Sequence, residues 1–307
     1  TTCGSRANNA AVDKIANLTR RSALFRAIRE YFYDRDFIEV ETPVKIHAPA
    51  PEEFIESVRA EGDFLRTSPE LAMKVMLADG FERIFQIGSC FRADEHGRRH
   101  REEFTMLEFY ARGMEYREQA QFTAGFVAEA ARRVLGGESV VYRGREVDLG
   151  SHEFITVEEA FRRYAGVSTQ EAERQDRFDE LMVTKIEPEL GRGRLTFLTD
   201  YPASRASLAR LRADNPAVAE RWELYIEGIE LANAFGELTD AAEQKARFRA
   251  ALEFRAAHGM HPYPAAVEFF AALDRGLPQS SGCAMGLDRL AMIFCDADDI
   301  GDVRSDG

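Results

Sequence analysis

The segment FRADEHGRRHREEFTMLEFY, residues 91–110, carries charges that suit a polyanionic ligand. Arg92 stands beside two carboxylates, and a basic run follows at residues 98–101. A second arginine, Arg289, follows the glycine-containing turn 282–288. A guanidinium offers planar, paired donors to phosphate oxygens, so arginines at the ends of two different elements suit a triphosphate. The alternative is that each arginine forms an ordinary surface ion pair.

A second set of charges lies in ELYIEGIELANAFGELTD, where Glu223, Glu230 and Glu237 are separated by steps of seven. Carboxylates among apolar residues are costly to bury unless a cation pairs with them. Mg²⁺ bridging phosphates, or a substrate ammonium group, would supply that cation. The alternative is a strand face exposed to water, because an odd separation puts successive members on opposite faces unless a bulge intervenes.

Two further acids, Glu70 and Glu108, stand near small or aromatic neighbours, and Tyr110 lies two residues from Glu108 on the same strand face. Several acids around one aromatic hydroxyl would suit an amino acid with two ammonium groups. Phe104 could stack on a purine, although a phenylalanine in a strand is more often part of the core.

The elements that would position these residues can be predicted from periodicity and capping. Helical spacing of apolar residues predicts a helix through Leu24–Phe32, followed by an extended segment, FIEVETPV, that ends near Pro43. Ser68 can cap a helix that begins at Pro69. Further elements are expected as follows: a hairpin of strands 83–94 and 103–112, an amphipathic helix at 118–135, a mostly helical insertion at 150–195, a strand pair at 221–240, and a turn into a helix at 280–294.

Composition limits the possible classes of protein. The chain has 307 residues and a formal net charge of −13, which disfavours extended binding to nucleic acid. No long apolar run or signal peptide is visible, so we expect a cytoplasmic protein that does not enter a membrane. The four cysteines show no metal-ligand spacing and are expected to be buried free thiols. Both common phosphate-binding loops, GxxxxGKS and GxGxxG, are absent, so a nucleotide would have to be bound by other residues.

Three segments together resemble the signature motifs of the class II aminoacyl-tRNA synthetases, in particular the lysyl branch. FIEVETPV resembles the first motif, with Pro43 at a dimer interface; FRADEHGRRHREEFTMLEFY resembles the second, and GCAMGLDR the third. The resemblance covers about residues 18–300 and implies an α+β fold, the class II catalytic domain, with an antiparallel sheet flanked by helices. It implies a homodimer and a catalytic domain at 18–307, and the preceding residues 1–17 are expected to form a polar tail.

One expected domain is missing from this pattern. Lysyl-tRNA synthetases carry an anticodon-reading barrel before the first motif, whereas about 20 residues precede it here, so we expect no anticodon-binding domain and no tRNA partner. The remaining domain organisation is similar to that of the short lysyl-synthetase paralogues that join (R)-β-lysine to elongation factor P. The segment YPASRASLA also resembles their FPASQASLA segment. The alternatives are a catalytic domain that charges tRNA and an inactive regulatory paralogue.

The resemblance implies a role for each matching residue. Arg92 and Arg289 are the expected catalytic residues, on the α-phosphate and the γ-phosphate of ATP. Mg²⁺ is expected on Glu223 and Glu230. The expected ATP-binding residues are Arg92, Ala93, Asp94, Glu95, Arg101, Phe104, Glu230, Leu231, Gly286 and Arg289. The expected residues for lysine or (R)-β-lysine are Ser68, Pro69, Glu70, Glu108, Tyr110, Asn233, Glu237 and Ala284, with Glu108, Tyr110 and Glu237 on the ε-ammonium and Asn233 near the carboxylate.

Two departures from the family pattern carry expectations of their own. The usual Arg-Asn-Glu is replaced by Arg92, Ala93 and Asp94, and we expect the adjacent Glu95 to substitute for the shortened carboxylate. Ala284 stands where lysyl synthetases tend to have glycine, and its methyl would push against an α-amino group while admitting a β-amino group. The basic loop 98–101 is expected to face the acceptor protein; the alternative is a solvated hairpin tip without a partner.

Overall fold

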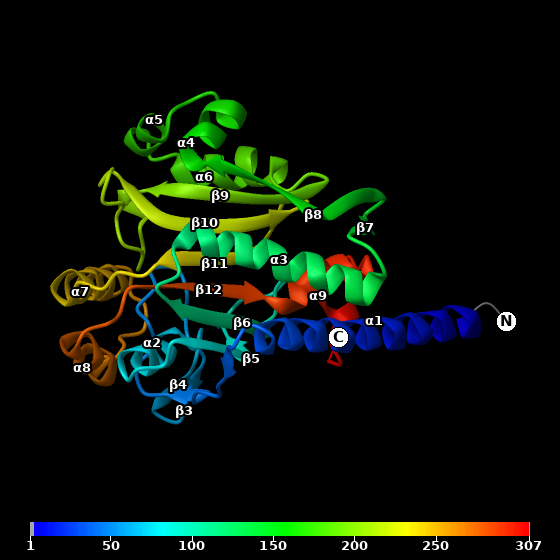
Figure 1. Cartoon of the computed structure of the whole chain (residues 1–307), viewed down its shortest axis with the longest axis horizontal. Coiled ribbons are helices and arrows are strands. Elements are labelled where there is room, and N and C mark those ends of the chain that lie inside the picture. The colour runs from blue at the N-terminus through cyan, green and yellow to red at the C-terminus, as the bar shows by residue number, and fades with distance from the viewer. Residues whose placement is uncertain (1–2, 307) are drawn as a thin grey trace.

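The computed structural model describes residues 3–306, with side chains described for 13–306. Across these residues the chain forms a nine-stranded sheet in the order β1-β5-β6-β12-β11-β10-β9-β8-β7, and a small sheet in the order β2-β4-β3. β1 pairs with β5 and β8 with β9 in parallel, whereas the other neighbours are antiparallel. This mostly antiparallel sheet with flanking helices confirms the predicted α+β class (Figure 1).

The bounds of the elements follow the chain. The strands are β1 (Ile38–Glu39), β2 (Lys45–Ile46), β3 (Arg59–Ala60), β4 (Asp63–Leu65), β5 (Arg83–Phe91), β6 (Glu103–Arg112), β7 (Ser139–Tyr142), β8 (Arg145–Thr156), β9 (Arg194–Pro202), β10 (Val218–Ile226), β11 (Ile229–Gly236) and β12 (Ser280–Gly286). The α-helices are α1 (Cys3–Tyr33), α2 (Glu70–Ala78), α3 (Tyr116–Leu135), α4 (Val157–Ala160), α5 (Thr169–Arg174), α6 (Phe178–Leu181), α7 (Ala241–Ala257), α8 (Val267–Arg275) and α9 (Leu287–Cys295).

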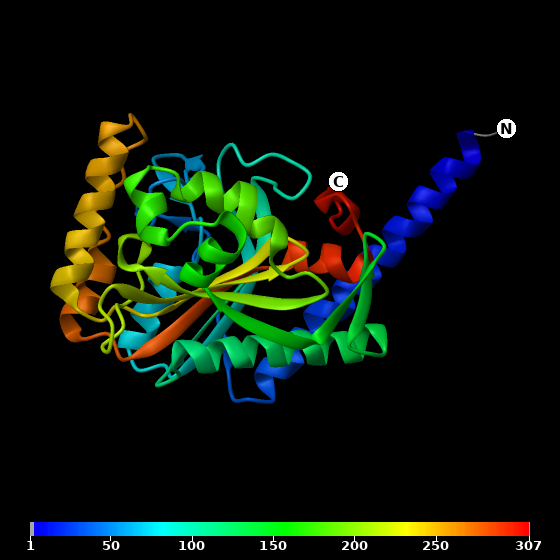
Figure 2. The same cartoon turned by 90° about the horizontal axis from the view of Figure 1, so that it is seen from above.

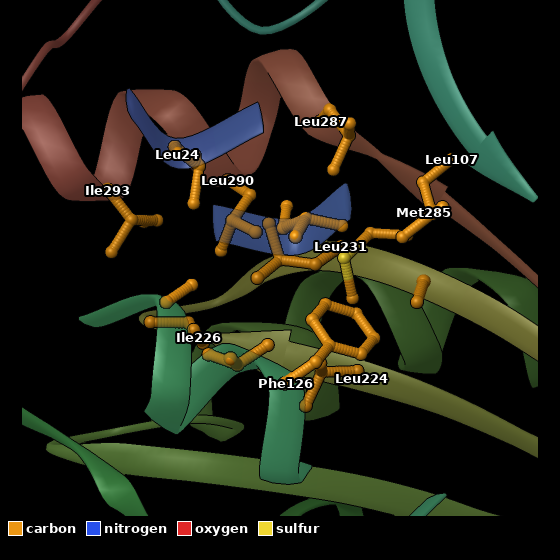
Figure 3. Packing of buried hydrophobic residues seen from close by; sticks show 14 of the residues in the cluster. Leu24, Leu107, Phe126, Leu224, Ile226, Leu231, Met285, Leu287, Leu290 and Ile293 are labelled. Atoms are coloured by element: carbon orange, nitrogen blue, oxygen red, sulfur yellow. The ribbon is translucent and has the colours of Figure 1, made fainter. Parts of the chain in front are cut away.

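The main core lies between the large sheet and helices α1, α3 and α9. The apolar residues that predicted the first helix are part of it, with Leu24, Ile28 and Phe32 buried. Figure 3 shows side chains from α1, α3 and α9 meeting those of the central strands. In Figure 2, α3 lies on one side of the sheet and α4–α6 on the other. Because one face is filled by this core, the acids of the central strands that alternate with it point to the opposite face.

The structure confirms the two predicted strand pairs, since β5 and β6 form the motif hairpin and β10 and β11 form the acidic pair. The two largest differences from prediction lie at the N-terminus and after residue 150. The N-terminal residues expected to form a tail belong to α1, which begins at Cys3 and extends past the rest of the molecule in Figures 1 and 2. The segment expected to be helical from residue 150 is still strand to Thr156, because β8 pairs with β9 there. Its helical part runs from Val157 to Glu189.

Two other expectations concern membranes and thiols. Among the described residues no helix combines the length and the apolar character that crossing a bilayer requires. Cys90, Cys283 and Cys295 are buried free thiols, as predicted. The side chain of Cys3 lies outside the described residues.

Candidate active site

A cavity of about 880 Å³ lies over β6, β10, β11 and β12 and brings together most of the predicted site residues. It is lined by Ser68, Glu70, Arg92, Glu95, Arg101, Phe104, Glu108, Tyr110, Glu223, Glu230, Leu231, Asn233, Glu237, Ala284, Gly286 and Arg289. Pro69, Ala93 and Asp94 were also predicted but do not line it. Because Glu95 lines the cavity and Asp94 does not, the placement favours Glu95 as the substituting carboxylate.

Strand register places several of these side chains in one row across the sheet. Glu108 on β6 is opposite Ala284 on β12, Ala284 is opposite Asn233 on β11, and Asn233 is opposite Glu223 on β10. Residues paired directly across neighbouring strands point to the same face. The row therefore runs from the acid expected at the substrate ammonium to the acid expected at the metal.

The acidic strand pair explains the spacing of seven. Glu223 lies on β10 and Glu230 on β11, so the separation spans a hairpin turn instead of one strand, and Glu230 is opposite Tyr225. Loss of solvent inside the cavity, together with the Glu223 carboxylate, raises the pKa of Glu230. Glu223 itself accepts hydrogen bonds from Arg221 Nη2 at 2.6 Å and Tyr225 Oη at 2.7 Å. Both carboxylates therefore reach one space from adjacent strands.

A third carboxylate, Glu187, lies near this pair and was not predicted from sequence. Desolvation, followed by the charges of Glu230 and Glu223, raises the pKa of Glu187 to about 7. No cluster of three or more acid, histidine or cysteine side chains with metal-binding geometry is found in the described part of the chain. A magnesium ion held by Glu223 and Glu230 would thus need other oxygen ligands, and the phosphates of a nucleotide offer them.

The two predicted arginines occupy different parts of the cavity. The guanidinium carbon of Arg92 lies 5.1 Å from the Phe104 ring centroid, and its Nη1 lies 3.7 Å from Glu95. Its Nε is buried and has no hydrogen-bond partner in the described structure. A buried donor without an acceptor is costly, so this atom suits an anionic ligand.

Arg289 is held between β11 and the basic loop. It donates from Nη1 to the Glu230 carbonyl at 2.8 Å, and its Nη2 lies 2.6 Å from His100 Nε2. The loop is tied to the segment after α9, because Ile300 N donates to the Arg98 carbonyl at 2.8 Å and Arg101 pairs with Asp299 at 3.0 Å. The basic loop therefore forms one wall beside Arg289.

The acids expected at the substrate ammonium are buried, and Glu108 is already hydrogen-bonded. Glu108 accepts from Ser68 Oγ at 2.6 Å and from Tyr110 Oη at 2.7 Å. Burial, together with the nearby Glu70 carboxylate, raises the pKa of Glu108 to about 8. Burial also raises the pKa of Glu237 to about 7. Glu108 therefore holds a proton at neutral pH that a bound cation could displace.

Lys74 on α2 contacts two acids of this pocket, and sequence reasoning missed it. Its fully buried ammonium lies 2.5 Å from Glu70 and 2.6 Å from Glu237. Desolvation opposes its charge, but the Glu237 and Glu70 carboxylates hold the pKa of Lys74 above its ordinary value. The i, i+4 spacing of Glu70 and Lys74 on the predicted helix was the available signal, whereas the contact with Glu237 is not visible in the sequence.

Gly282 on β12 shows how tightly this pocket is built. A Cβ atom there would lie 2.2 Å from Tyr110 Cε1 and 2.4 Å from Glu237 Oε1. Both atoms belong to side chains packed against the strand, so a larger residue would displace Tyr110 or Glu237. The glycine thus lets both predicted ammonium ligands approach the strand.

Comparison with known proteins gives the family. The family model for tRNA synthetases class II (D, K and N) matches residues 9–305. The chain belongs to this family. The match confirms the resemblance of the three motif segments, and membership of the class II synthetases implies the use of ATP.

Curated relatives in the class II family fall into two kinds. The protein named elongation factor P–(R)-β-lysine ligase from Enterobacter sp. (strain 638) is 38% identical over 305 residues, which cover 94% of each chain. The protein of the same name from Pectobacterium atrosepticum is 37% identical, again over 94% of each chain. The protein named lysine–tRNA ligase from Azoarcus sp. (strain BH72) is 36% identical over 92% of this chain, which spans 62% of the relative's length.

Proposed function

We propose that the chain is a ligase that uses ATP and Mg²⁺ to activate lysine, in particular (R)-β-lysine, and transfers it to a lysine side chain of elongation factor P in the cytoplasm. The observation that carries this proposal is the match, over 94% of both chains, to relatives that bear this ligase name. A cavity that joins partly buried arginines to a cluster of acids supports it. The lysine–tRNA ligase relatives make tRNA charging the second candidate.

In the first step, Arg92 binds the α-phosphate of ATP and the substrate carboxylate, while Arg289 binds the γ-phosphate and Phe104 stacks on adenine. Magnesium on Glu223 and Glu230 supplies positive charge to the phosphates when it is bound. The substrate carboxylate then attacks the α-phosphorus in line and releases pyrophosphate, which leaves an acyl-adenylate. The contribution of the protein is positioning and charge neutralisation.

In the second step, the amine of the acceptor lysine attacks the activated carbonyl and AMP leaves, so that an amide forms. The basic loop 98–101 faces the acceptor in this proposal. The protein acts as a homodimer through the region around Pro43. Support for the dimer comes from the short edge strand β1 and from four exposed apolar side chains around it, namely Tyr33, Ile38, Val44 and Phe81.

The proposed activation is tested by lysine-dependent exchange of pyrophosphate into ATP. We expect exchange with (R)-β-lysine or lysine in the absence of any acceptor, because the adenylate forms before transfer. Separate incubations with tRNA and with elongation factor P then distinguish the two candidates. Acylation of tRNA alone would contradict the first candidate and support the second, while absence of exchange with either lysine would contradict both.

Replacing Ala284 by glycine should relax selection between the two lysines. The methyl of Ala284 lies in the row between Glu108 and Asn233, and one methyl in a tight pocket is worth about 1–3 kcal/mol of discrimination. We expect kcat/KM for α-lysine to rise relative to (R)-β-lysine by roughly 5- to 100-fold in the exchange reaction. The KM for ATP serves as the control and should not change. A ratio that stays at the wild-type value would show that the methyl plays no part in selection.

Binding of the amino acid should strengthen as pH rises toward 8. Glu108 is protonated below its raised pKa of about 8, and Glu237 below about 7, whereas an ammonium group is bound by the ionised carboxylates. We expect the KM for the amino acid to fall by roughly tenfold between pH 6.5 and 7.5 at saturating ATP, as one proton is released per molecule bound. Calorimetry in two buffers of different ionisation enthalpy measures that proton directly. A KM independent of pH, with no proton released, would contradict this assignment.

A further inference from the structure

The loop between β2 and β3 holds a carboxylate, Glu52, over the cavity, and no expectation from sequence includes it. The backbone of this loop is fixed by Arg255 of α7, whose side chain is 1% exposed. Arg255 Nη1 donates to the carbonyls of Glu52 at 2.8 Å and Ile55 at 2.9 Å, and Nη2 donates to Glu56 at 2.6 Å. The loop is therefore held firmly against the body of the protein.

The same loop is tied to the strand end that carries Arg92. Ala93 N donates to the Glu56 carbonyl at 2.8 Å, and Ser57 N donates to Tyr263 Oη at 2.8 Å. The guanidinium carbon of Arg255 also lies 3.9 Å from the ring centroid of Tyr263, so the two residues that hold the loop contact each other. Glu52 is thus placed at a defined position relative to Arg92.

The carboxylate of Glu52 differs from the acids assigned above to the ammonium and magnesium sites. Glu223 is paired with Arg221, Glu237 with Lys74, and Glu108 accepts two hydroxyl hydrogen bonds. The carboxylate of Glu52 has no hydrogen bond or ion pair among the residues that the structure describes. Loss of solvent raises its pKa, and the charges that act on it are Arg92, Glu70, Arg221 and Glu95. A desolvated carboxylate without a partner favours binding of a cation.

The neighbours of Glu52 indicate which cation would bind. In the proposed function, Arg92 holds the substrate carboxylate, and Glu108 and Glu237 hold the ε-ammonium at the far end. The second ammonium of a diamino acid is attached one or two carbons from the carboxylate and must therefore lie near Arg92. Glu237 is assigned to the ε-ammonium, and Glu70 already pairs with the Lys74 ammonium at 2.5 Å, so Glu70 is less available to the second ammonium.

We propose that Glu52 binds the second ammonium group of the substrate and so makes the site select diamino acids over amino acids that carry a single terminal amine. This inference rests on the proposed function and adds a specificity-determining residue to it. Arg255 acts as a positioning residue, because it reaches the substrate only through the loop that it clamps.

The test compares Glu52→Gln with Glu61→Gln, a matched change at an exposed carboxylate that does not line the cavity. Kinetics of exchange are measured with (R)-β-lysine and lysine, and 6-aminohexanoic acid, which lacks the second amine, is measured as a competing ligand. Glu52→Gln should lower kcat/KM for the diamino acid by roughly 10- to 100-fold, mainly through KM, because a charge-assisted contact is lost. Binding of 6-aminohexanoic acid and the KM for ATP should stay within about threefold of the wild type. Glu61→Gln should behave as the wild type, and Glu52→Asp should recover part of the loss.

The assignment of Glu52 would be overturned if Glu52→Gln weakened binding of the diamino acid and of 6-aminohexanoic acid equally, or weakened binding of neither. An unchanged thermal midpoint shows that the variant is folded. Failure of the proposed function would be a separate result, because the wild type would then show no lysine-dependent exchange of pyrophosphate into ATP. Calorimetric titration of wild type and Glu52→Gln with the diamino acids would still test Glu52 in that case, and equal affinities would reject it.

Discussion

Replacing Arg92 by alanine should lower amino-acid-dependent pyrophosphate exchange by roughly 10³- to 10⁵-fold, the range found when an arginine that stabilises a phosphoryl transition state is removed. Arg92 directly follows the strand β5, its guanidinium carbon lies 5.1 Å from the Phe104 ring centroid, and its buried Nε has no partner in the described structure. Its donors are therefore available to charge that develops at the α-phosphorus. Arg92→Lys should recover only part of the activity, because an ammonium cannot bind two oxygens in a planar fork.

The control for this change is Arg83→Ala, at the exposed start of the same strand, where the side chain donates to the Arg35 carbonyl at 3.2 Å. That variant should keep wild-type exchange. Thermal midpoints of both variants should stay near the wild type, since neither arginine is part of the apolar core. If Arg92→Ala retains more than about a tenth of wild-type exchange, Arg92 does not act on the reacting phosphate.

Replacing Lys74 by methionine should cause the largest loss of stability, about 3–5 kcal/mol in the free energy of unfolding. The change leaves Glu70 and Glu237 in a buried pocket without their shared cation. The folded-state pKa of Glu237, already raised to about 7, should rise further, because an attractive charge is removed. A carboxyl with a raised folded pKa stabilises the fold below its unfolded pKa and loses that contribution as pH rises. The deficit of Lys74→Met should therefore be larger at pH 8 than at pH 5.5.

Denaturant unfolding at both pH values measures this effect. Lys45→Met is the control, because Lys45 forms an exposed ion pair with Asp63 at 3.5 Å and should contribute less than about 1 kcal/mol. The double variant Lys74→Met, Glu237→Gln should regain part of the loss, since it removes the unpaired charge together with its partner. A deficit equal to that of Lys45→Met would show that the buried pair contributes no more than a surface pair.

The sequence predicted the parts of the fold that local patterns specify. The alternation of apolar and polar residues in 83–94 and 103–112 was sufficient for the β5 and β6 hairpin, and the apolar spacing around Leu24 for the core face of α1. The end of β8 was not predictable in this way. Residues up to Thr156 are strand because they pair with β9, some forty residues further along the chain.

The candidate site likewise combines residues that the sequence predicts with contacts that it does not predict. Arg92, Glu108 and Glu230 stand in recognisable motifs, and the cavity contains all three. The contacts that set their charges come from distant segments: Lys74 reaches Glu237 from α2, and Arg255 fixes the Glu52 loop from α7. Such contacts depend on how helices pack against the sheet, and a single sequence carries no local signal for that packing.

Mass spectrometry of elongation factor P after incubation with the enzyme, ATP, Mg²⁺ and each lysine isomer tests the central claim most directly. We predict that one lysine side chain of elongation factor P gains a single lysyl group, more with (R)-β-lysine than with α-lysine, and that Arg92→Ala abolishes the gain. An unmodified elongation factor P under conditions in which the same enzyme charges tRNA with lysine would contradict the account.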